Sequence, residues 1–96
     1  MVGFLKDELS PPQIAEATGA VEVLRVWCAP GEPQQLVLRT TWKDPGAWGL
    51  LLVDAARHAA KAYAAEGMSE AEALNRILQL FRAEIESPTA NPTNVS

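Results

Sequence analysis

The sequence predicts a small α+β protein with the element order α-β-β-α-α, and two observations carry that prediction. Between Val21 and Gly67 the apolar residues change from a spacing of about two, typical of strands, to one of about 3.6, typical of helices. A capping-box pattern at Ser69 to Glu72 then opens a second helical stretch. We therefore expect a β-hairpin followed by two antiparallel helices that pack on one face of its sheet.

The first element is a predicted short helix near the N-terminus. Ser10 can cap it, Pro11 suits its first turn, and Gly19 can close it. We expect this N-terminal segment to span 1–19, with Phe4 and Leu5 either frayed at the chain end or docked on a neighbour.

The two predicted strands are Val21–Cys28 and Gln35–Trp42, which are rich in β-branched and aromatic residues. The Pro-Gly turn at 29–33 between them predicts an antiparallel hairpin. The hydrophobic pattern favours the register in which Leu24 faces Leu38 and Val26 faces Leu36 on one aliphatic face, whereas a slip by one residue would exchange the two faces. In this register the other face carries Val23, Arg25, Trp27, Val37 and Arg39.

Residues typical of helix ends predict two helices in the rest of the chain. Asp44 and Pro45 begin the first helix and Gly67 ends it. The second helix begins at the Ser69 capping box and stops before Pro88. The expected apolar stripes are Trp48, Leu51, Leu52, Ala55, Ala59 and Ala62 or Tyr63 on the first helix, and Leu74, Ile77, Leu78, Phe81 and Ile85 on the second.

Length and charge limit the class of protein. The 96 residues suffice for one domain, which we place at 20–87, followed by a mobile tail at 88–96. Eight Lys and Arg against twelve Asp and Glu give a net charge of −4, which disfavours nucleic acid and membranes as partners. No apolar run approaches the roughly 20 residues of a membrane span, and no secretory signal is recognisable, so we expect a cytoplasmic protein.

A two-stranded hairpin is marginally stable by itself, and two helices that cover one face leave its edges open. We therefore predict a homodimer, with hairpins that join into a four-stranded sheet or pack face to face. The alternative is a monomer whose N-terminal segment covers the exposed edge.

Three sets of residues are candidates for function. Asp54 and His58, four residues apart on a helix, could form a carboxylate-oriented imidazole for proton transfer, although an exposed charge pair is the more ordinary interpretation. Arg25 and Arg39, beside Trp27, could bind a carboxylate or phosphate, unless Glu22 or another acidic residue satisfies them.

The third set is aromatic. Trp27, Trp42 and Trp48 are expected in the core or at the dimer interface rather than in a ligand pocket. The lone Cys28 cannot form an intramolecular disulfide, and we expect it to pack among Val26, Trp27 and Ala29. With one His and one Cys, the chain cannot assemble a His/Cys metal site by itself, so we expect neither metal nor cofactor.

Several motifs together resemble a bacterial family of about 100-residue proteins known as a domain of unknown function. They are the run Val21–Trp27, the Ala29-Pro30-Gly31 turn, Asp44-Pro45-Gly46-Ala47-Trp48-Gly49 and Asp54-Ala55-Ala56-Arg57-His58. The resemblance covers 20–88 and implies no activity, substrate or cofactor. The sequence thus favours a noncatalytic protein-protein interaction module, with a small-anion binder as the alternative and an enzyme as a minor third.

Overall fold

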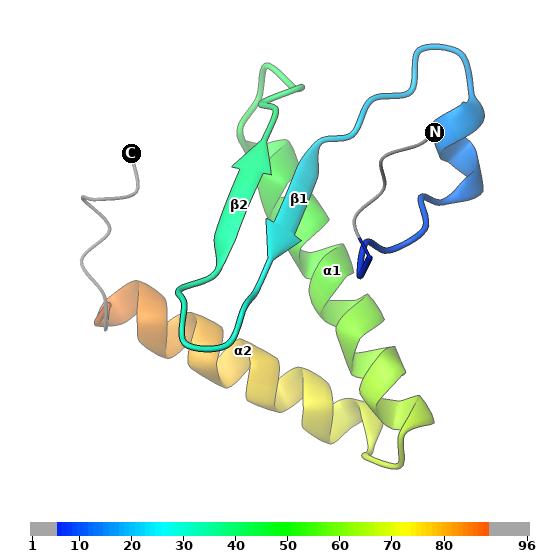
Figure 1. Ribbon diagram of the computed structural model, residues 1–96. Helices are drawn as coiled ribbons and strands as arrows, with labels where there is room; N and C mark the ends of the chain where they lie inside the picture. The colour runs from blue at the N-terminus through cyan, green and yellow to red at the C-terminus, as the bar shows by residue number, and fades with distance from the viewer. Residues whose placement is uncertain (1–5, 89–96) are drawn as a thin grey trace. The chain divides into compact units, whose positions relative to one another are not determined.

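The computed structural model describes residues 6–88 and contains an antiparallel hairpin and two helices, which confirms the α+β class (Figure 1). The chain divides into two compact units, Met1–Lys43 and Asp44–Ser96. Phe4, Leu5 and the tail from 89 onward lie outside the described residues, so the predictions made for them stay untested.

The predicted N-terminal helix is wrong: the structure has only a 3₁₀ turn, η1, at Gln13–Glu16. The physical reason is the proline pair. Pro12 pushes the preceding residue away from the helical region and itself has extended backbone angles, so no helix begins at Ser10. After the turn, Ala17 is again extended and Gly19 has a φ of 81°, which ends the element.

The hairpin consists of β1 (Leu24–Trp27) and β2 (Gln35–Leu38). Its register matches the prediction, since Leu24 pairs with Leu38 and Val26 with Leu36. The strands are shorter than predicted because the ladder stops soon after Arg39, whose N–H donates to the Val23 carbonyl at 2.9 Å. Thr41 then adopts a positive φ of 63°, which no strand can continue through.

The first helix, α1, spans Gly46–Ala65. Asp44 acts at its start as predicted, because Oδ1 accepts a 2.8 Å hydrogen bond from the Gly46 N–H. Gly67, with a φ of 113°, ends the turn after the helix, and this conformation favours glycine. The predicted boundaries of α1 are therefore correct to within two residues.

The second helix, α2, spans Glu70–Glu86. Ser69 caps it, since Oγ accepts a 3.3 Å hydrogen bond from the Glu72 N–H. The helices meet beside the turn and separate toward their far ends (Figure 1). The two helices are the expected neighbours, whereas their packing against the sheet stays a prediction because the hairpin and the helices belong to different units.

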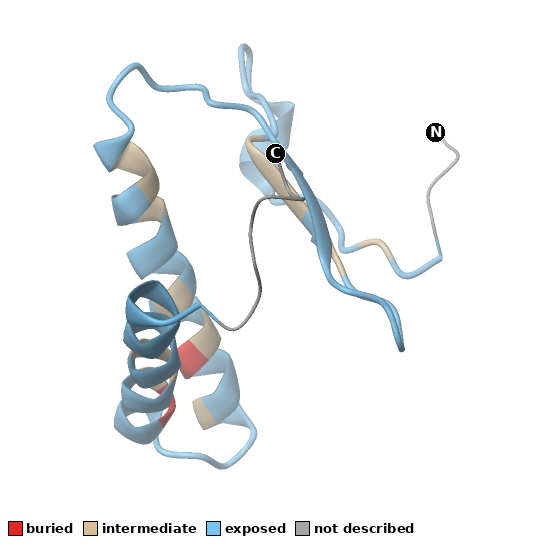
Figure 2. Ribbon diagram, turned by 90° about the vertical axis from the view of Figure 1, so that its left-hand side faces the viewer, coloured by how far each residue is buried: buried red, intermediate tan, exposed pale blue. Residues whose placement is uncertain are grey.

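Burial within the described residues is slight (Figure 2). Ala60 on α1 and Ala73 on α2 are their only buried side chains, and none of their large side chains is fully buried. On α1 the half-buried positions include Ala56 rather than the predicted Ala55. On α2, Leu74, Ile77 and Leu78 are half-buried, whereas the predicted stripe members beyond them, Phe81 and Ile85, are exposed.

Candidate functional site

Arg25 projects from β1 and is held by two acidic side chains. Its Nε and Nη2 donate to the Glu22 carboxylate at 3.2 and 3.0 Å, and its Nη1 lies 3.2 Å from Glu8 Oε2. The hydrogen bonds that Arg25 donates to Glu22, followed by the charge of Glu22 and that of Glu8, raise the pKa of Arg25 against the opposing effect of desolvation. Arg25 is therefore a cation with partners of its own.

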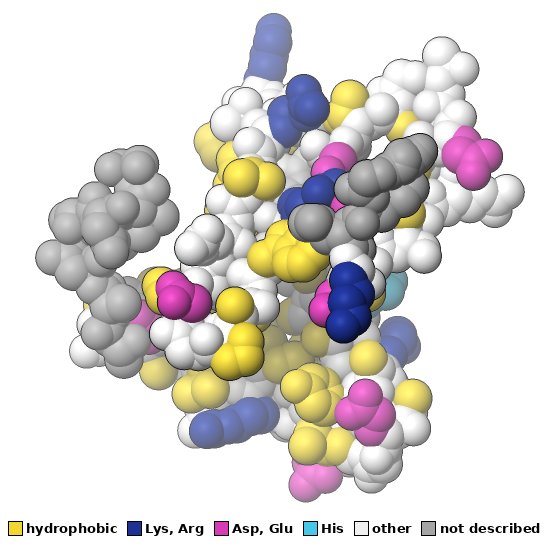
Figure 3. All heavy atoms as spheres, in the orientation of Figure 1, with side chains coloured by type: hydrophobic (Ala, Val, Ile, Leu, Met, Phe, Trp, Pro, Cys, Tyr) yellow, Lys and Arg dark blue, Asp and Glu magenta, His cyan; other side chains and the backbone are white. Residues whose placement is uncertain are grey.

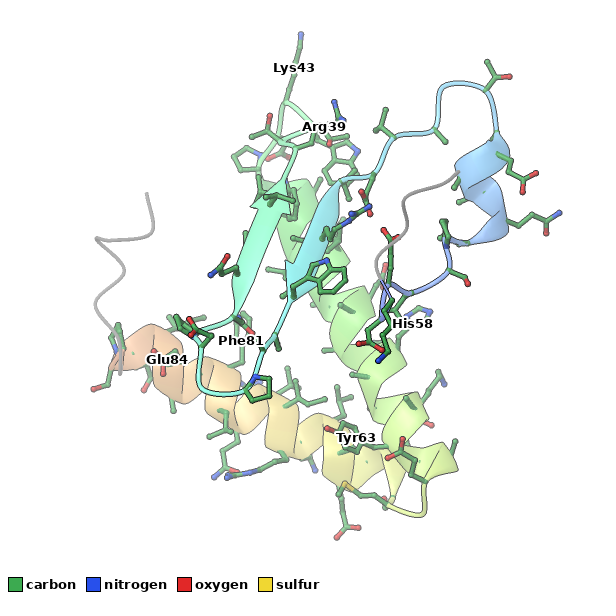
Figure 4. The ribbon with its side chains drawn as sticks, viewed as in Figure 1. Arg39, Lys43, His58, Tyr63, Phe81 and Glu84 are labelled. Carbon is green, nitrogen blue, oxygen red and sulfur yellow. The ribbon has the colours of Figure 1, made fainter. Side chains whose placement is uncertain are left out.

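Arg39, which directly follows β2, contacts the same glutamate from the other strand of the hairpin. Its Nε donates to the Glu22 main-chain oxygen at 3.3 Å, so both predicted arginines contact a single residue (Figure 4 labels Arg39). The hairpin register brings the two side chains onto one face, as expected. A shallow hollow of about 280 Å³ lies here, lined by Glu22, Val23, Leu24, Arg25, Val37, Leu38 and Arg39.

A larger groove, of about 800 Å³, runs along β1. One wall is the stretch 7–15 and the other is the stretch 20–28, so the groove lies wholly within the first unit. The Glu8–Arg25 ion pair joins the two walls. Sequence reasoning missed Glu8 and this groove, because a charge in an irregular N-terminal segment has no periodicity that predicts its partner.

Asp54 and His58 come close together, but not through the carboxylate. His58 Nδ1 lies 2.8 Å from the main-chain oxygen of Asp54. A carbonyl oxygen only accepts, so Nδ1 carries the proton and Nε2 has the lone pair in the neutral ring. Both residues are exposed on α1. The carboxylate-oriented imidazole that proton transfer would use is thus not the contact that this structure contains.

The three tryptophans lie in different settings. Trp27 is half-buried on β1 and lines the 800 Å³ groove. Trp42 follows the hairpin and is 41% exposed, whereas Trp48 is half-buried in the first turn of α1. Their predicted role at an interface between copies stays a prediction. Cys28 is exposed, so the expectation that it packs among its neighbours is wrong, because the strand ends at Trp27.

Within 6–88, no cluster of three or more His, Cys, Asp or Glu side chains is arranged to hold a metal ion. In the same residues no helix combines the length and the apolar character needed to cross a membrane.

Comparison with models of protein families finds a match over most of the chain. The model of DUF5076, a domain of unknown function, matches residues 8–89. The chain belongs to this family. The resemblance inferred from the hairpin and helix motifs is thereby confirmed. No curated protein matches the chain.

Among solved structures, this DUF5076 chain is similar to one described as "a putative pyruvate dehydrogenase from the photosynthetic bacterium Rhodopseudomonas palustrus CGA009". The two share 41% identity over 96% of this chain and 95% of the other, with a TM-score of 0.73. The likeness therefore extends over nearly the whole length of both proteins. The activity in that description is stated of the Rhodopseudomonas protein.

Proposed function

We propose that this DUF5076 chain is a noncatalytic assembly module that acts through protein–protein contact, as a homodimer in the cytoplasm. The observation that carries the proposal is the lack of burial: among the described residues only Ala60 and Ala73 are buried. Burial of apolar surface is the main favourable contribution to folding, at about 25 cal/mol per Å². A chain that leaves its large apolar side chains in water gains stability by association.

The exposed apolar residues occur in both units, and Figure 3 shows hydrophobic side chains at the surface over the hairpin and the helices. The hairpin contributes Val26, Leu36, Val37 and Leu38, and the helices contribute Leu50, Leu52, Val53, Tyr63, Leu80, Phe81 and Ile85. Single exposed hydrophobic residues are ordinary, whereas a strand whose four residues are all exposed is not.

Sedimentation equilibrium over a range of micromolar concentrations tests the proposal. We expect a mass of about twice the 10.4 kDa of one chain. A mass of one chain at every concentration would contradict it.

A second candidate is a site for a small anion, and the convergence of Arg25 and Arg39 on Glu22 favours it. The 280 Å³ hollow that both arginines line can hold a carboxylate or phosphate group if the Glu22 side chain turns away. A thermal-shift screen of dicarboxylates and nucleotides tests it. Stabilisation should occur with the natural chain and with Arg57→Gln, an exposed arginine on α1, and be lost with Arg39→Gln.

A further inference from the structure

The two edges of the hairpin differ in what lies beside them. The stretch 7–15 flanks β1 and is tied to it by the 3.2 Å Glu8–Arg25 ion pair (Figure 1). Within 6–88, the sheet contains only β1 and β2, so β2 has no strand on its outer side. A new strand pairs at about 4.8 Å, and at β1 it would compete with the flanking stretch for that space.

The hydrogen-bond pattern identifies which main-chain groups point outward. The Arg39 N–H donates to the Val23 oxygen, so this pair is of the hydrogen-bonded type. Hydrogen-bonded and non-hydrogen-bonded pairs alternate along an antiparallel ladder. Val37 therefore points its N–H and C=O toward Arg25, whereas Leu36 and Leu38 point theirs away from β1.

We propose that β2 of one chain pairs antiparallel with β2 of a second copy, about a two-fold axis at Val37. This inference rests on the proposed homodimer and names its surface. In this register the outward groups of Leu36 meet those of the partner's Leu38, and the reciprocal pair follows by symmetry. The result is a four-stranded sheet of order β1-β2-β2-β1.

Three properties of β2 suit a second copy. The strand Gln35–Leu38 contains no charge and no proline, so it has neither of the usual features that protect an edge strand, and self-pairing brings no like charges together. Leu36, Val37 and Leu38 are 48%, 68% and 52% exposed.

The third property is the match of faces. Pairing Leu36 with the partner's Leu38 keeps the aliphatic face, Leu24, Val26, Leu36 and Leu38, continuous across the joint. A shift by one residue would place the outward-pointing main-chain groups of one strand opposite the inward-pointing groups of the other. It would also put the aliphatic side chains of the two copies on opposite faces of the sheet, so this register is excluded. A shift by two residues would carry the pairing past the strand, to Gln34 at one end or Thr40 at the other.

Proline substitution tests which edge is used. Leu36→Pro removes an outward N–H from β2, and Val26→Pro removes the equivalent N–H from β1 directly opposite, at nearly the same exposure of 45%. Neither variant removes a hydrogen bond of the hairpin itself. We expect loss of the dimer mass in sedimentation with Leu36→Pro and its retention with Val26→Pro.

Cysteine cross-linking tests the register without relying on the proline variants. In the proposed register the two copies of Val37 lie opposite each other as a non-hydrogen-bonded pair. The Cα atoms of such a pair are about 4.5 Å apart, which is within the range of a disulfide. In a Cys28→Ser background, Val37→Cys should give an oxidised covalent dimer. Val23→Cys, which lies just before β1 and so away from the β2–β2 joint, should not.

The outcomes separate the two proposals. If the natural chain is a monomer, the proposed homodimer fails. If the natural chain is a dimer but Leu36→Pro remains one, or if Leu36→Cys or Leu38→Cys cross-links more readily than Val37→Cys, then the homodimer stands and the β2 pairing about Val37 is wrong.

Discussion

Lys61 Nζ on α1 lies 3.1 Å from Glu70 Oε2, and this ion pair joins the last turns of the first helix to the first residue of the second. Both side chains are largely in water, with exposures of 67% and 49%. An exposed ion pair gains little because solvent screens the charges and two long side chains lose freedom. The pair therefore marks where the helices meet but does little to hold them together.

We expect Lys61→Met to lower the free energy of unfolding by no more than about 1 kcal/mol. Urea denaturation of Lys61→Met, Glu70→Gln and the double variant measures the coupling of the pair. A coupling energy well above about 1 kcal/mol would contradict the assignment of this pair as an exposed one.

Ala60 is fully buried, with an exposure of 0%, so a larger side chain has no free space there. We expect Ala60→Leu to destabilise the chain by about 1–3 kcal/mol because it overpacks the contact. Ala62→Leu is the matched control, since Ala62 is exposed on the same helix. Chemical denaturation compares the two, and equal stabilities would show that the burial at Ala60 is not maintained in solution.

The Ser69 hydroxyl supplies the side-chain cap of α2. Its removal in Ser69→Ala should cost about 1 kcal/mol, because the Glu72 N–H loses its acceptor. The control is Ser10→Ala, since the 3₁₀ turn that follows Ser10 has no side-chain cap to lose. The midpoint of thermal unfolding by circular dichroism should fall for the first variant and stay unchanged for the second.

Substitution by alanine should change the stability of the chain in opposite directions at two glycines, Gly67 and Gly49. Gly67 has a φ of 113°, and a Cβ there meets nothing within 4 Å, so Gly67→Ala is destabilising through the backbone alone, by about 1–2 kcal/mol. Gly49 lies inside α1, also with open space around it, so Gly49→Ala should stabilise by about 0.5–1 kcal/mol. Differential scanning calorimetry gives both shifts, and two shifts of the same sign would argue against the turn geometry at Gly67.

Glu8 holds the N-terminal stretch to β1 through Arg25. Glu8→Gln should speed amide hydrogen exchange over residues 6–16 and leave α2 unchanged, whereas Asp7→Asn should change neither. Added salt should have the same effect as Glu8→Gln, because it screens the pair.

The pH dependence of this contact follows from the direction of the Arg25 shift. The pKa of Arg25 is raised in the folded chain, so its contribution is complete below the ordinary arginine value and is lost only at still higher pH. Between neutral and mildly alkaline pH the contribution of Arg25 is therefore constant. Exchange over 6–16 that sped up across this range, after correction for the intrinsic rate, would contradict this.

The register of the hairpin is a feature that the local hydrophobic pattern could predict. Leu24 and Val26 share one face of β1, and Leu36 and Leu38 share one face of β2. A slip by one residue would put the two pairs on opposite faces of the sheet, so the pattern favoured the pairing that the structure has. The starts and ends of the helices were predictable for a similar reason, because Asp44, Gly67 and Ser69 act on main-chain groups within a few residues of themselves.

The sequence by itself thus determined the α+β class, the hairpin register and the helix boundaries, each of which depends on interactions between near neighbours in the chain. The tertiary structure alone decided that Glu8 joins Arg25 and that Glu22 is shared by both arginines. Periodicity specifies the face on which a side chain lies. It does not specify which distant group, or which main-chain oxygen, arrives at that face, because this depends on the path of irregular segments that have no period.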